Sequence, residues 1–291
     1  MPMEQQEKSA RIGTRINAKE IAEPFRNLIK RAIADQKGPK PKLVGLLANK
    51  DVAAKKYAQW TAQACEYDGI EFELREMEQN QLEDELNSAN NDNSIHGIIV
   101  YYPVFGMLPH FMGNTVDDYI RDSVSIEKDV EGLCFTYRNN LFRNIRFLDE
   151  EKTKKCILPC TALAIVKILE HLNTFNSNLS VGKRLKGTII TIINRSDIVG
   201  RPLAAMLSND GARVYSVDIK STYLLENGKY SECDEEVAEA IQKSSIIITG
   251  VPSKSYRLPV SCIRENSIVI NFSRFDNIDV PSLMKIKGVR H

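Results

Sequence analysis

Two series of short apolar runs, each followed by a helix-length segment, constrain the fold of this chain more than any other feature. In the first half, residues 42–49 (KLVGLLAN) and 95–101 (IHGIIVY) are typical of strands buried on both faces. Residues 187–193 and 245–249 have the same character in the second half. Because parallel strands need a long crossover, usually a helix, the pattern predicts an α/β protein with two domains.

The less regular stretch at residues 102–160 separates the two series, and a length of 291 residues fits two domains. We expect a first α/β domain at residues 1–155 and a second at residues 156–291. The second is expected to be a Rossmann-like, doubly wound parallel sheet with a polar insertion at residues 220–233. We also expect a cleft between the two domains.

Helix signals are clearest in the segment that follows residues 42–49. Asp51 is expected to cap a helix that ends at Gly69 and carries Val52, Tyr57 and Trp60 on one face.

The charge balance argues against some classes of function. Lys+Arg 39 and Asp+Glu 38 leave a net charge of +1, which disfavours a nucleic-acid binder that relies on basicity and a polybasic membrane anchor. No apolar run approaches the ~20 residues of a membrane helix, and residues 1–15 read as a polar tail without a secretory leader. The six cysteines form no CxxC pair, so we expect reduced thiols, a cytoplasmic protein and no metal site.

Residues 186–219 have the spacing of a Rossmann first crossover, although the G-x-G-x-x-G fingerprint is absent. A strand leads into the turn Asn194-Arg195-Ser196, a helix follows, and a second strand ends at Asp218. Arg195 is suited to supply charge for a pyrophosphate, Ser196 to donate a hydrogen bond, and Asp218 to accept hydrogen bonds from a ribose. On spacing alone, a plain βαβ unit with a surface arginine is an equally good interpretation.

The strand at residues 246–249 runs directly into Gly250-Val251-Pro252. Loops at the carboxyl ends of strands face the ligand in a doubly wound sheet, and Gly250 would allow the backbone to approach a cofactor. A simple turn that ends the strand is the alternative.

Aromatic and acidic residues gather in the first half. Tyr101 and Tyr102 follow a strand and are suited to form a platform for a heteroaromatic ring, and Asp129 and Glu131 to bind a ring that displays adjacent N–H donors. Core tyrosines and a solvated acidic turn would give the same pattern.

Six blocks occur in a fixed order: AAKKYAQWTAQACEYDGI, GIIVYYPVFG, EKDVEGL, LPCTALAIVKIL, INRSDIVGRPLAAMLSNDGA and ITGVPS. Together they resemble the methylenetetrahydrofolate dehydrogenase/cyclohydrolase family over about residues 18–273. The resemblance implies oxidation of 5,10-methylenetetrahydrofolate to 5,10-methenyltetrahydrofolate in one-carbon metabolism and purine biosynthesis, by a cytoplasmic homodimer.

Three positions depart from the bifunctional pattern of that family. Bifunctional members have Tyr-x-x-x-Lys, where this chain has Tyr57 and Thr61; they have Gln at the position of Tyr101 and Asp at that of Glu131. Thr cannot replace the ammonium of Lys. The chain therefore resembles the fungal monofunctional, NAD-dependent members, and Asp218 would repel the 2′-phosphate of NADP.

The resemblance assigns roles by position. Cys160 and Tyr57 are expected to be catalytic, although a structural Cys at a helix start fits position 160 equally well. The expected substrate-binding residues are Tyr57, Tyr101, Asp129, Glu131 and Thr161, and the expected NAD-binding residues are Arg195, Ser196, Asp218, Ile219, Gly250, Val251 and Pro252.

Two alternative functions stay open. One is a bifunctional dehydrogenase/cyclohydrolase. The other is a catalytically silent NAD-binding paralogue, because we do not find the family's closing folate loop and last helix before His291.

Overall fold

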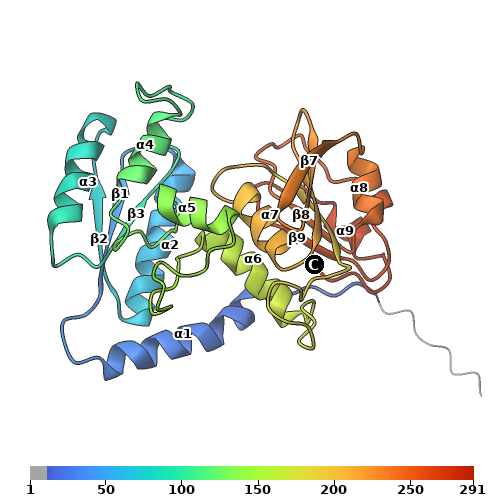
Figure 1. Cartoon of the computed structure of the whole chain (residues 1–291), viewed down its shortest axis with the longest axis horizontal. Helices are drawn as coiled ribbons and strands as arrows, with labels where there is room; N and C mark the ends of the chain where they lie inside the picture. Colours follow the sequence, from blue (N-terminus) through green and yellow to red (C-terminus); the bar gives the residue numbers. More distant parts are fainter. Residues whose placement is uncertain (1–11) are drawn as a thin grey trace, which may run out of the picture. The chain divides into compact units, whose positions relative to one another are not determined.

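The computed structural model describes residues 12–291 and divides them into two units (Figure 1). The first unit is Lys19–Cys160, and the second unit is Thr161–His291 together with residues 12–18. Residues 1–11 of the expected polar tail lie outside the described residues. Each unit contains a β-sheet with helices, which confirms the predicted α/β class. The expected boundary between the two domains at residue 155 and the expected cleft between them stay predictions.

The first unit is built on a parallel sheet in the order β2-β1-β3. Its elements are α1 (Ala18–Asp35, whose first residue belongs to the second unit), β1 (Lys42–Leu47), α2 (Val52–Asp68), β2 (Glu71–Glu76), η1 (Gln79–Gln81), α3 (Leu82–Asn91), β3 (Gly97–Val100), α4 (Val116–Ser123) and α5 (Phe135–Phe142).

Helices cover both faces of this sheet, as the continuous apolar strands require. On one face, Val44 and Leu46 of β1 pack with Leu86 of α3 and Ile120 of α4. On the other face, the small residues of α2 pack with Leu47 and with residues at the end of β3. Two apolar layers therefore fix β3, whose carboxyl end leads to the candidate site.

Helix α2 has the predicted ends but not the predicted packing. Asp51 accepts a hydrogen bond from the Ala53 amide at 2.9 Å, and Gly69 closes the helix with a φ of 86°. The buried residues are Ala54, Ala58 and Cys65, whereas Val52 is 78% and Trp60 57% exposed. Small side chains let the helix approach the sheet closely, so large residues lie on the outer side.

The second unit contains a six-stranded sheet in the order β7-β6-β5-β4-β8-β9 within the described residues. Its elements are α6 (Cys160–His171, whose first residue belongs to the first unit), β4 (Ile189–Ile193), α7 (Gly200–Asn209), β5 (Arg213–Val217), β6 (Thr222–Glu226), β7 (Lys229–Cys233), α8 (Val237–Lys243), β8 (Ile246–Thr249), η2 (Val260–Cys262), β9 (Ile268–Asn271) and α9 (Val280–Leu283).

Strands β5, β4, β8 and β9 are parallel, as predicted, and the polar insertion at residues 220–233 is regular structure that was not predicted from the sequence. These residues form β6 and β7, an antiparallel hairpin that adds to the edge of the sheet beside β5. Asn227 and Gly228 make the turn, with φ values of 52° and 73°. An Asn-Gly pair with positive φ is the usual two-residue hairpin turn, so the signal was present in the sequence.

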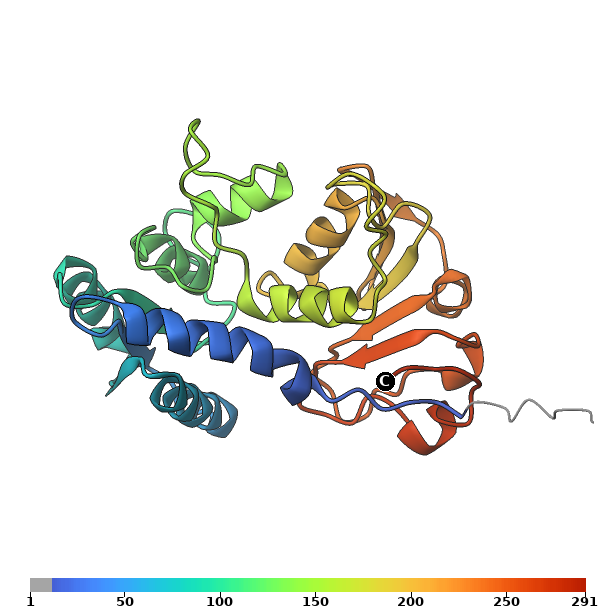
Figure 2. The same ribbon diagram turned by 90° about the horizontal axis from the view of Figure 1, so that it is seen from below.

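The described ends of the chain lie side by side at the β9 edge of the same sheet (Figure 2). The Val269 amide donates to the Arg290 carbonyl at 2.9 Å, and the Thr14 amide donates to the Val289 carbonyl at 2.7 Å. Both segments thereby satisfy backbone groups that an edge strand would leave unpaired.

Among residues 12–291, no helix is both long enough and apolar enough to cross a membrane.

Candidate functional site

The segment Lys128–Gly132 is tied to the sheet of the first unit beside β3. The Ile98 amide donates to the Lys128 carbonyl at 2.8 Å, and the Lys128 ammonium donates to the carbonyls of Ala89, Asn90 and Asp92 at 2.7 to 2.9 Å. Lys128 thus satisfies carbonyls at the end of α3 that the helix leaves free. Lys128 thereby anchors the segment Lys128–Gly132 to the end of α3.

Asp129 shapes this loop from within. Its buried carboxylate accepts hydrogen bonds from the amides of Glu131, Gly132 and Cys134 at 3.0, 2.9 and 2.8 Å. Gly132 has a φ of 65°, and a Cβ there would lie 2.8 Å from the Ile157 carbonyl oxygen. Both Asp129 oxygens are therefore engaged by the backbone that presents Glu131, and direct contact of Asp129 with substrate stays a prediction.

Glu131 lies in the same segment, and its surroundings strongly change the pKa of its carboxyl group. Its carboxylate accepts a long hydrogen bond, 3.4 Å, from the Val100 amide at the end of β3. Burial raises the pKa of Glu131 to about 8, against a weaker lowering effect of this amide, and the nearby Asp129 charge adds to the rise. The side chain is thus mostly neutral at neutral pH.

Tyr57, Tyr101 and Cys160 lie together with Glu131. The rings of Tyr57 and Tyr101 meet edge to face, with centroids 5.5 Å apart and an interplanar angle of 88°. Burial, followed by the influence of Cys160 and Glu131, raises the pKa of Tyr57, whose hydroxyl is hydrogen-bonded to the Cys160 side chain. Cys160 is the first residue of α6 and is exposed.

Thr61 lies one helical turn after Tyr57 on α2, and its hydroxyl donates to the Tyr57 carbonyl at 3.0 Å. Burial raises the pKa of Tyr101 to about 12, although the Thr61 hydroxyl lowers it. The hydroxyl groups of positions 57, 61 and 101 are therefore neutral at physiological pH, and no ammonium stands at position 61.

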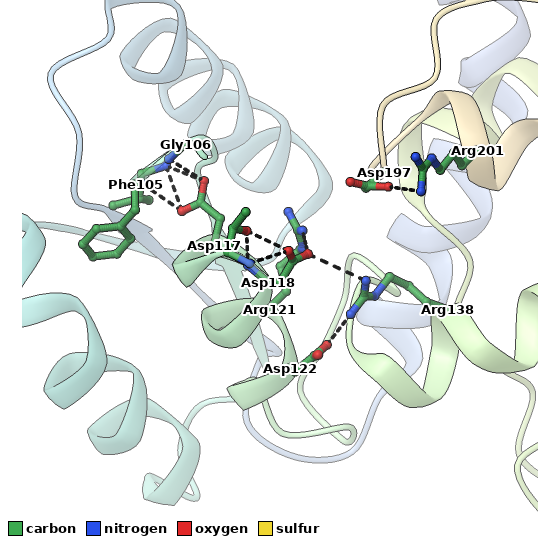
Figure 3. A network of polar contacts seen from close by, with 11 residues as sticks. Phe105, Gly106, Asp117, Asp118, Arg121, Asp122, Arg138, Asp197 and Arg201 are labelled. Carbon is green, nitrogen blue, oxygen red and sulfur yellow. Dashed lines mark hydrogen bonds and ion pairs between the residues drawn. The ribbon is translucent and has the colours of Figure 1, made fainter. Parts of the chain in front are cut away.

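Sequence patterns did not reveal the residues that hold the turn after β3 (Figure 3). The buried Asp117 carboxylate accepts hydrogen bonds from the amides of Val104, Phe105 and Gly106 at 2.8 to 3.3 Å. The Asn49 amide group donates to the carbonyls of Tyr101 and Pro103 at 2.7 and 3.0 Å. Thr115 and Asp118 form a capping box at the start of α4, and nothing in the sequence marked Asp117 as an anchor.

A second group of charges braces α4 against α5 (Figure 3). Asp118 pairs with Arg121, while Arg138 of α5 pairs with Asp122 at 2.6 Å and lies 3.9 Å from Asp118. The guanidinium carbon of Arg121 lies 5.4 Å from the Tyr102 ring centroid. The network thus links α4 and α5 and places one guanidinium near Tyr102.

In the second unit, the loops after β4, β5 and β8 share one edge of the sheet because these strands are parallel and in register. The Asn194 amide group donates to the Gly250 carbonyl at 2.9 Å and accepts from the Ser196 amide at 3.0 Å. The Ser196 hydroxyl oxygen accepts from the amides of Val199 and Gly200, both at 3.3 Å, just before and at the first residue of α7. Its own proton stays available as a donor.

The turn after β5 presents Asp218 and Ile219 to solvent. Asp218 is exposed, with one carboxylate oxygen accepting from the Ile219 amide at 2.8 Å, and Ile219 is 97% exposed. An exposed carboxylate at this strand end matches the ribose-binding acid of a dinucleotide site.

Arg195 does not extend freely from its loop. Its guanidinium donates to the Ser216 carbonyl at 2.6 Å, to the Ser221 carbonyl at 2.7 Å and to the Ser221 hydroxyl at 2.8 Å. The expected contact with a pyrophosphate stays a prediction.

The loop Gly250–Pro252 is fixed by residues that follow β9. Fully buried Asn277 accepts from the Val251 amide at 2.9 Å and donates to the Ser253 carbonyl at 3.3 Å, while the Ser273 hydroxyl donates to the Val251 carbonyl at 2.8 Å. A Cβ at Gly250 would lie 2.0 Å from the Phe272 ring. Asn277 carried no recognisable signal in the sequence.

The described residues thus form two clusters from the predicted set. Tyr57, Tyr101, Glu131 and Cys160 lie together in the first unit, and Thr161 follows in the first turn of α6. The loops with Ser196, Asp218 and Gly250 form the second cluster. No group of three or more His, Cys, Asp and Glu side chains suited to a metal ion occurs in residues 12–291.

Two segments of the chain match the domains of one family. Residues 16–131 match the tetrahydrofolate dehydrogenase/cyclohydrolase catalytic domain, and residues 159–273 match the NAD(P)-binding domain of the same family.

Individual relatives match most of the chain. It is 46% identical over 272 residues to methylenetetrahydrofolate dehydrogenase [NAD(+)] of Dictyostelium discoideum, covering 91% of this chain and 84% of the relative. It is 48% identical over 257 residues to the Schizosaccharomyces pombe protein of the same name, covering 86% and 78%. The solved NAD-dependent 5,10-methylenetetrahydrofolate dehydrogenase from Saccharomyces cerevisiae superposes with a TM-score of 0.87 at 41% identity, covering 96% of this chain and 91% of that one. These matches confirm the resemblance, and the chain belongs to the tetrahydrofolate dehydrogenase/cyclohydrolase family.

Proposed function

We propose that this chain oxidises 5,10-methylenetetrahydrofolate to 5,10-methenyltetrahydrofolate with NAD. The observation that carries the proposal is the cluster of Tyr57, Tyr101, Glu131 and Cys160, with a neutral Thr61 beside it, in a chain 46% and 48% identical to relatives named for this NAD-dependent activity. The cluster offers aromatic surface, hydroxyl groups and one carboxyl group, which suit a flat, nitrogen-rich ring.

The substrate's own nitrogens drive the chemistry. A hydride leaves the methylene carbon with both bonding electrons, and the positive charge that remains is shared by the two folate nitrogens. No general base is required, so the chain contributes positioning and electrostatic support. The exposed Tyr57 borders the ring, the buried Tyr101 supports the Tyr57 ring edge to face, and Glu131, when ionised, supports the developing cation.

The residues of the second unit fit NAD. Bound NAD supplies the hydride acceptor. Asp218 is exposed to accept hydrogen bonds from ribose hydroxyls, Ile219 offers apolar surface beside it, and the Ser196 hydroxyl retains a donor. Gly250, Val251 and Pro252 form a loop held rigid by Asn194 and Asn277. Arg195 completes the set, with its guanidinium bonded to the turn that carries Asp218.

The biological setting is part of the same proposal. The family resemblance supports a homodimer that works in one-carbon metabolism and purine biosynthesis. None of the six cysteines forms a disulfide within residues 12–291, which supports a cytoplasmic location. Light scattering of the purified chain tests the homodimer.

The experiment is a steady-state assay of the full chain with methylenetetrahydrofolate and NAD, in which reduced nicotinamide is followed by absorbance. We expect turnover, and we expect Tyr57→Phe and Glu131→Gln to lower kcat/KM for the folate. Tyr67→Phe on the same helix and Glu127→Gln on the same loop are the matched controls. NAD binding without turnover by the wild-type chain would instead support the catalytically silent paralogue.

A further inference from the structure

The turn after β5 is built around a guanidinium group. The turn spans residues 218–221 and is closed by a hydrogen bond from the Asp218 amide to the Ser221 carbonyl at 3.0 Å. Arg195 reaches it from the loop after β4, which is the neighbouring strand. Its three hydrogen bonds all fall on Ser216 and Ser221, on either side of Asp218.

The same guanidinium is also covered by an aromatic ring. Its central carbon lies 4.5 Å from the centroid of Tyr223, the second residue of β6. Within residues 12–291, no ion pair joins Arg195 to a carboxylate. The Arg195 charge therefore faces carbonyl oxygens and the face of a ring. A planar guanidinium with several donors can make these contacts at the same time, whereas a lysine ammonium cannot.

This inference rests on the proposed NAD-dependent function. We propose that Arg195 is a specificity-determining positioning residue, which fixes the Asp218 turn for an unphosphorylated ribose instead of binding the pyrophosphate. Fixing the turn has two effects on cofactor choice. It holds the Asp218 carboxylate where a 2′-phosphate would have to lie, and it keeps the Arg195 guanidinium away from such a phosphate.

Two roles for Arg195 make different predictions. A pyrophosphate ligand contacts a group that NAD and NADP share, so its loss weakens both cofactors by the same factor. A clamp on the Asp218 turn acts where the two cofactors differ. Its loss must therefore change the ratio of kcat/KM for NAD to kcat/KM for NADP.

The test uses Arg195→Lys, Ser221→Ala and Tyr223→Leu in the full chain, assayed with both cofactors at saturating methylenetetrahydrofolate. We expect Arg195→Lys to lower the NAD-to-NADP ratio by about tenfold and the other two variants by about threefold, mainly through KM for NAD. Ser221→Ala removes a single hydroxyl group, so it reports on the clamp even where Arg195→Lys fails to fold. Arg213→Lys at the far end of β5 and Ser231→Ala on β7 are the matched controls.

An unchanged ratio in Arg195→Lys and Ser221→Ala, with both cofactors weakened equally, would overturn the inference. A binding measurement separates it from the proposed function. ADP-ribose and its 2′-phosphate are titrated into the wild-type chain and the variants by calorimetry. Preference of the wild type for ADP-ribose that falls in the variants supports the clamp even in a chain without turnover, whereas equal binding of the two probes by the wild type contradicts it.

Discussion

Glu131 joins the chemistry of the first unit to pH. Its pKa lies at about 8, chiefly because of burial, so the carboxylate forms as the pH rises through this value. We expect kcat/KM for the folate to rise across the same window, because only the ionised form supports the developing cation. Glu131→Gln should lower kcat/KM and remove the rise, while Glu127→Gln keeps it. A profile that is flat near pH 8 in the wild type would contradict this role.

The same carboxyl group affects stability, with a sign that follows from proton linkage. Its ordinary pKa is 4.5 and its folded value is about 8, so the folded chain binds more protons between these pH values. The free energy of unfolding should therefore fall as the pH rises through this window, and Glu131→Gln should remove that part of the fall. Denaturant unfolding of both chains at about pH 5 and about pH 8 measures it. An equal fall in the two chains would assign the effect to other groups.

Asp218 sets the prediction for cofactor preference. Its exposed carboxylate favours a ribose with free hydroxyls and repels a phosphate. We expect kcat/KM for NAD to exceed that for NADP by more than about tenfold, or about 1.4 kcal/mol. Asp218→Ser should narrow the gap, with Asp234→Ser as the control. Equal use of both cofactors by the wild type would contradict the assignment.

Sequence reasoning at this scale found residue types but not their partners. Tyr57, Tyr101 and Glu131 were expected on motif grounds and lie together. The three hydrogen bonds of Arg195 and those of Asp129 to its own loop were not foreseen, because such contacts depend on the path of the backbone after the strand ends. A charged residue in a motif therefore indicates a site, but the motif does not show whether the charge contacts a ligand or the backbone of the chain itself.

At the scale of elements, the loop after β8 depends on a segment far along the chain. Asn277 is 0% exposed and bonds the Val251 amide and the Ser253 carbonyl. Asn277→Ala removes the partner of two part-buried backbone groups, at up to about 1–3 kcal/mol for each. We expect a lower Tm and a higher KM for NAD, with KM for the folate unchanged, while exposed Asn178→Ala changes neither. An unchanged KM for NAD would show that the loop does not need this anchor.

The ends of α2 could be predicted from local chemistry, whereas the face of the helix that is buried could not. Asp51 and Gly69 marked the ends of α2 because caps act on the nearest backbone groups. The face of α2 that carries Val52 and Trp60 is nonetheless exposed, because the sheet accepts the small side chains of Ala54 and Ala58. The β6–β7 hairpin was missed because the polar composition of residues 220–233 hid the Asn-Gly turn.

At the scale of the whole molecule, the chain is expected to perform one of the two activities in its family's name. Cyclohydrolase chemistry in bifunctional relatives relies on a lysine where this chain has Thr61, and Thr61 supplies only a neutral hydroxyl beside Tyr101. We expect hydrolysis of methenyltetrahydrofolate at the rate of the uncatalysed reaction. A rate proportional to enzyme concentration would show that another group activates water.

The order of blocks along the chain carried the functional conclusion further than any single motif did. The first unit and the second unit each gave an α/β pattern that many proteins share, and a fold of this kind does not fix a reaction. The family followed because the folate-type and dinucleotide-type blocks occur in one chain and in one order, and matches over residues 16–131 and 159–273 confirmed it.

Direct transfer of hydrogen from the folate methylene carbon to NAD is the central claim. The measurement that tests it most directly uses methylenetetrahydrofolate with both methylene hydrogens replaced by deuterium, NAD and the full chain in ordinary water, with mass spectrometry of the NADH formed. The account predicts that each NADH molecule carries one deuterium from the folate. NADH without deuterium, or no NADH from a chain that binds both molecules, would contradict it.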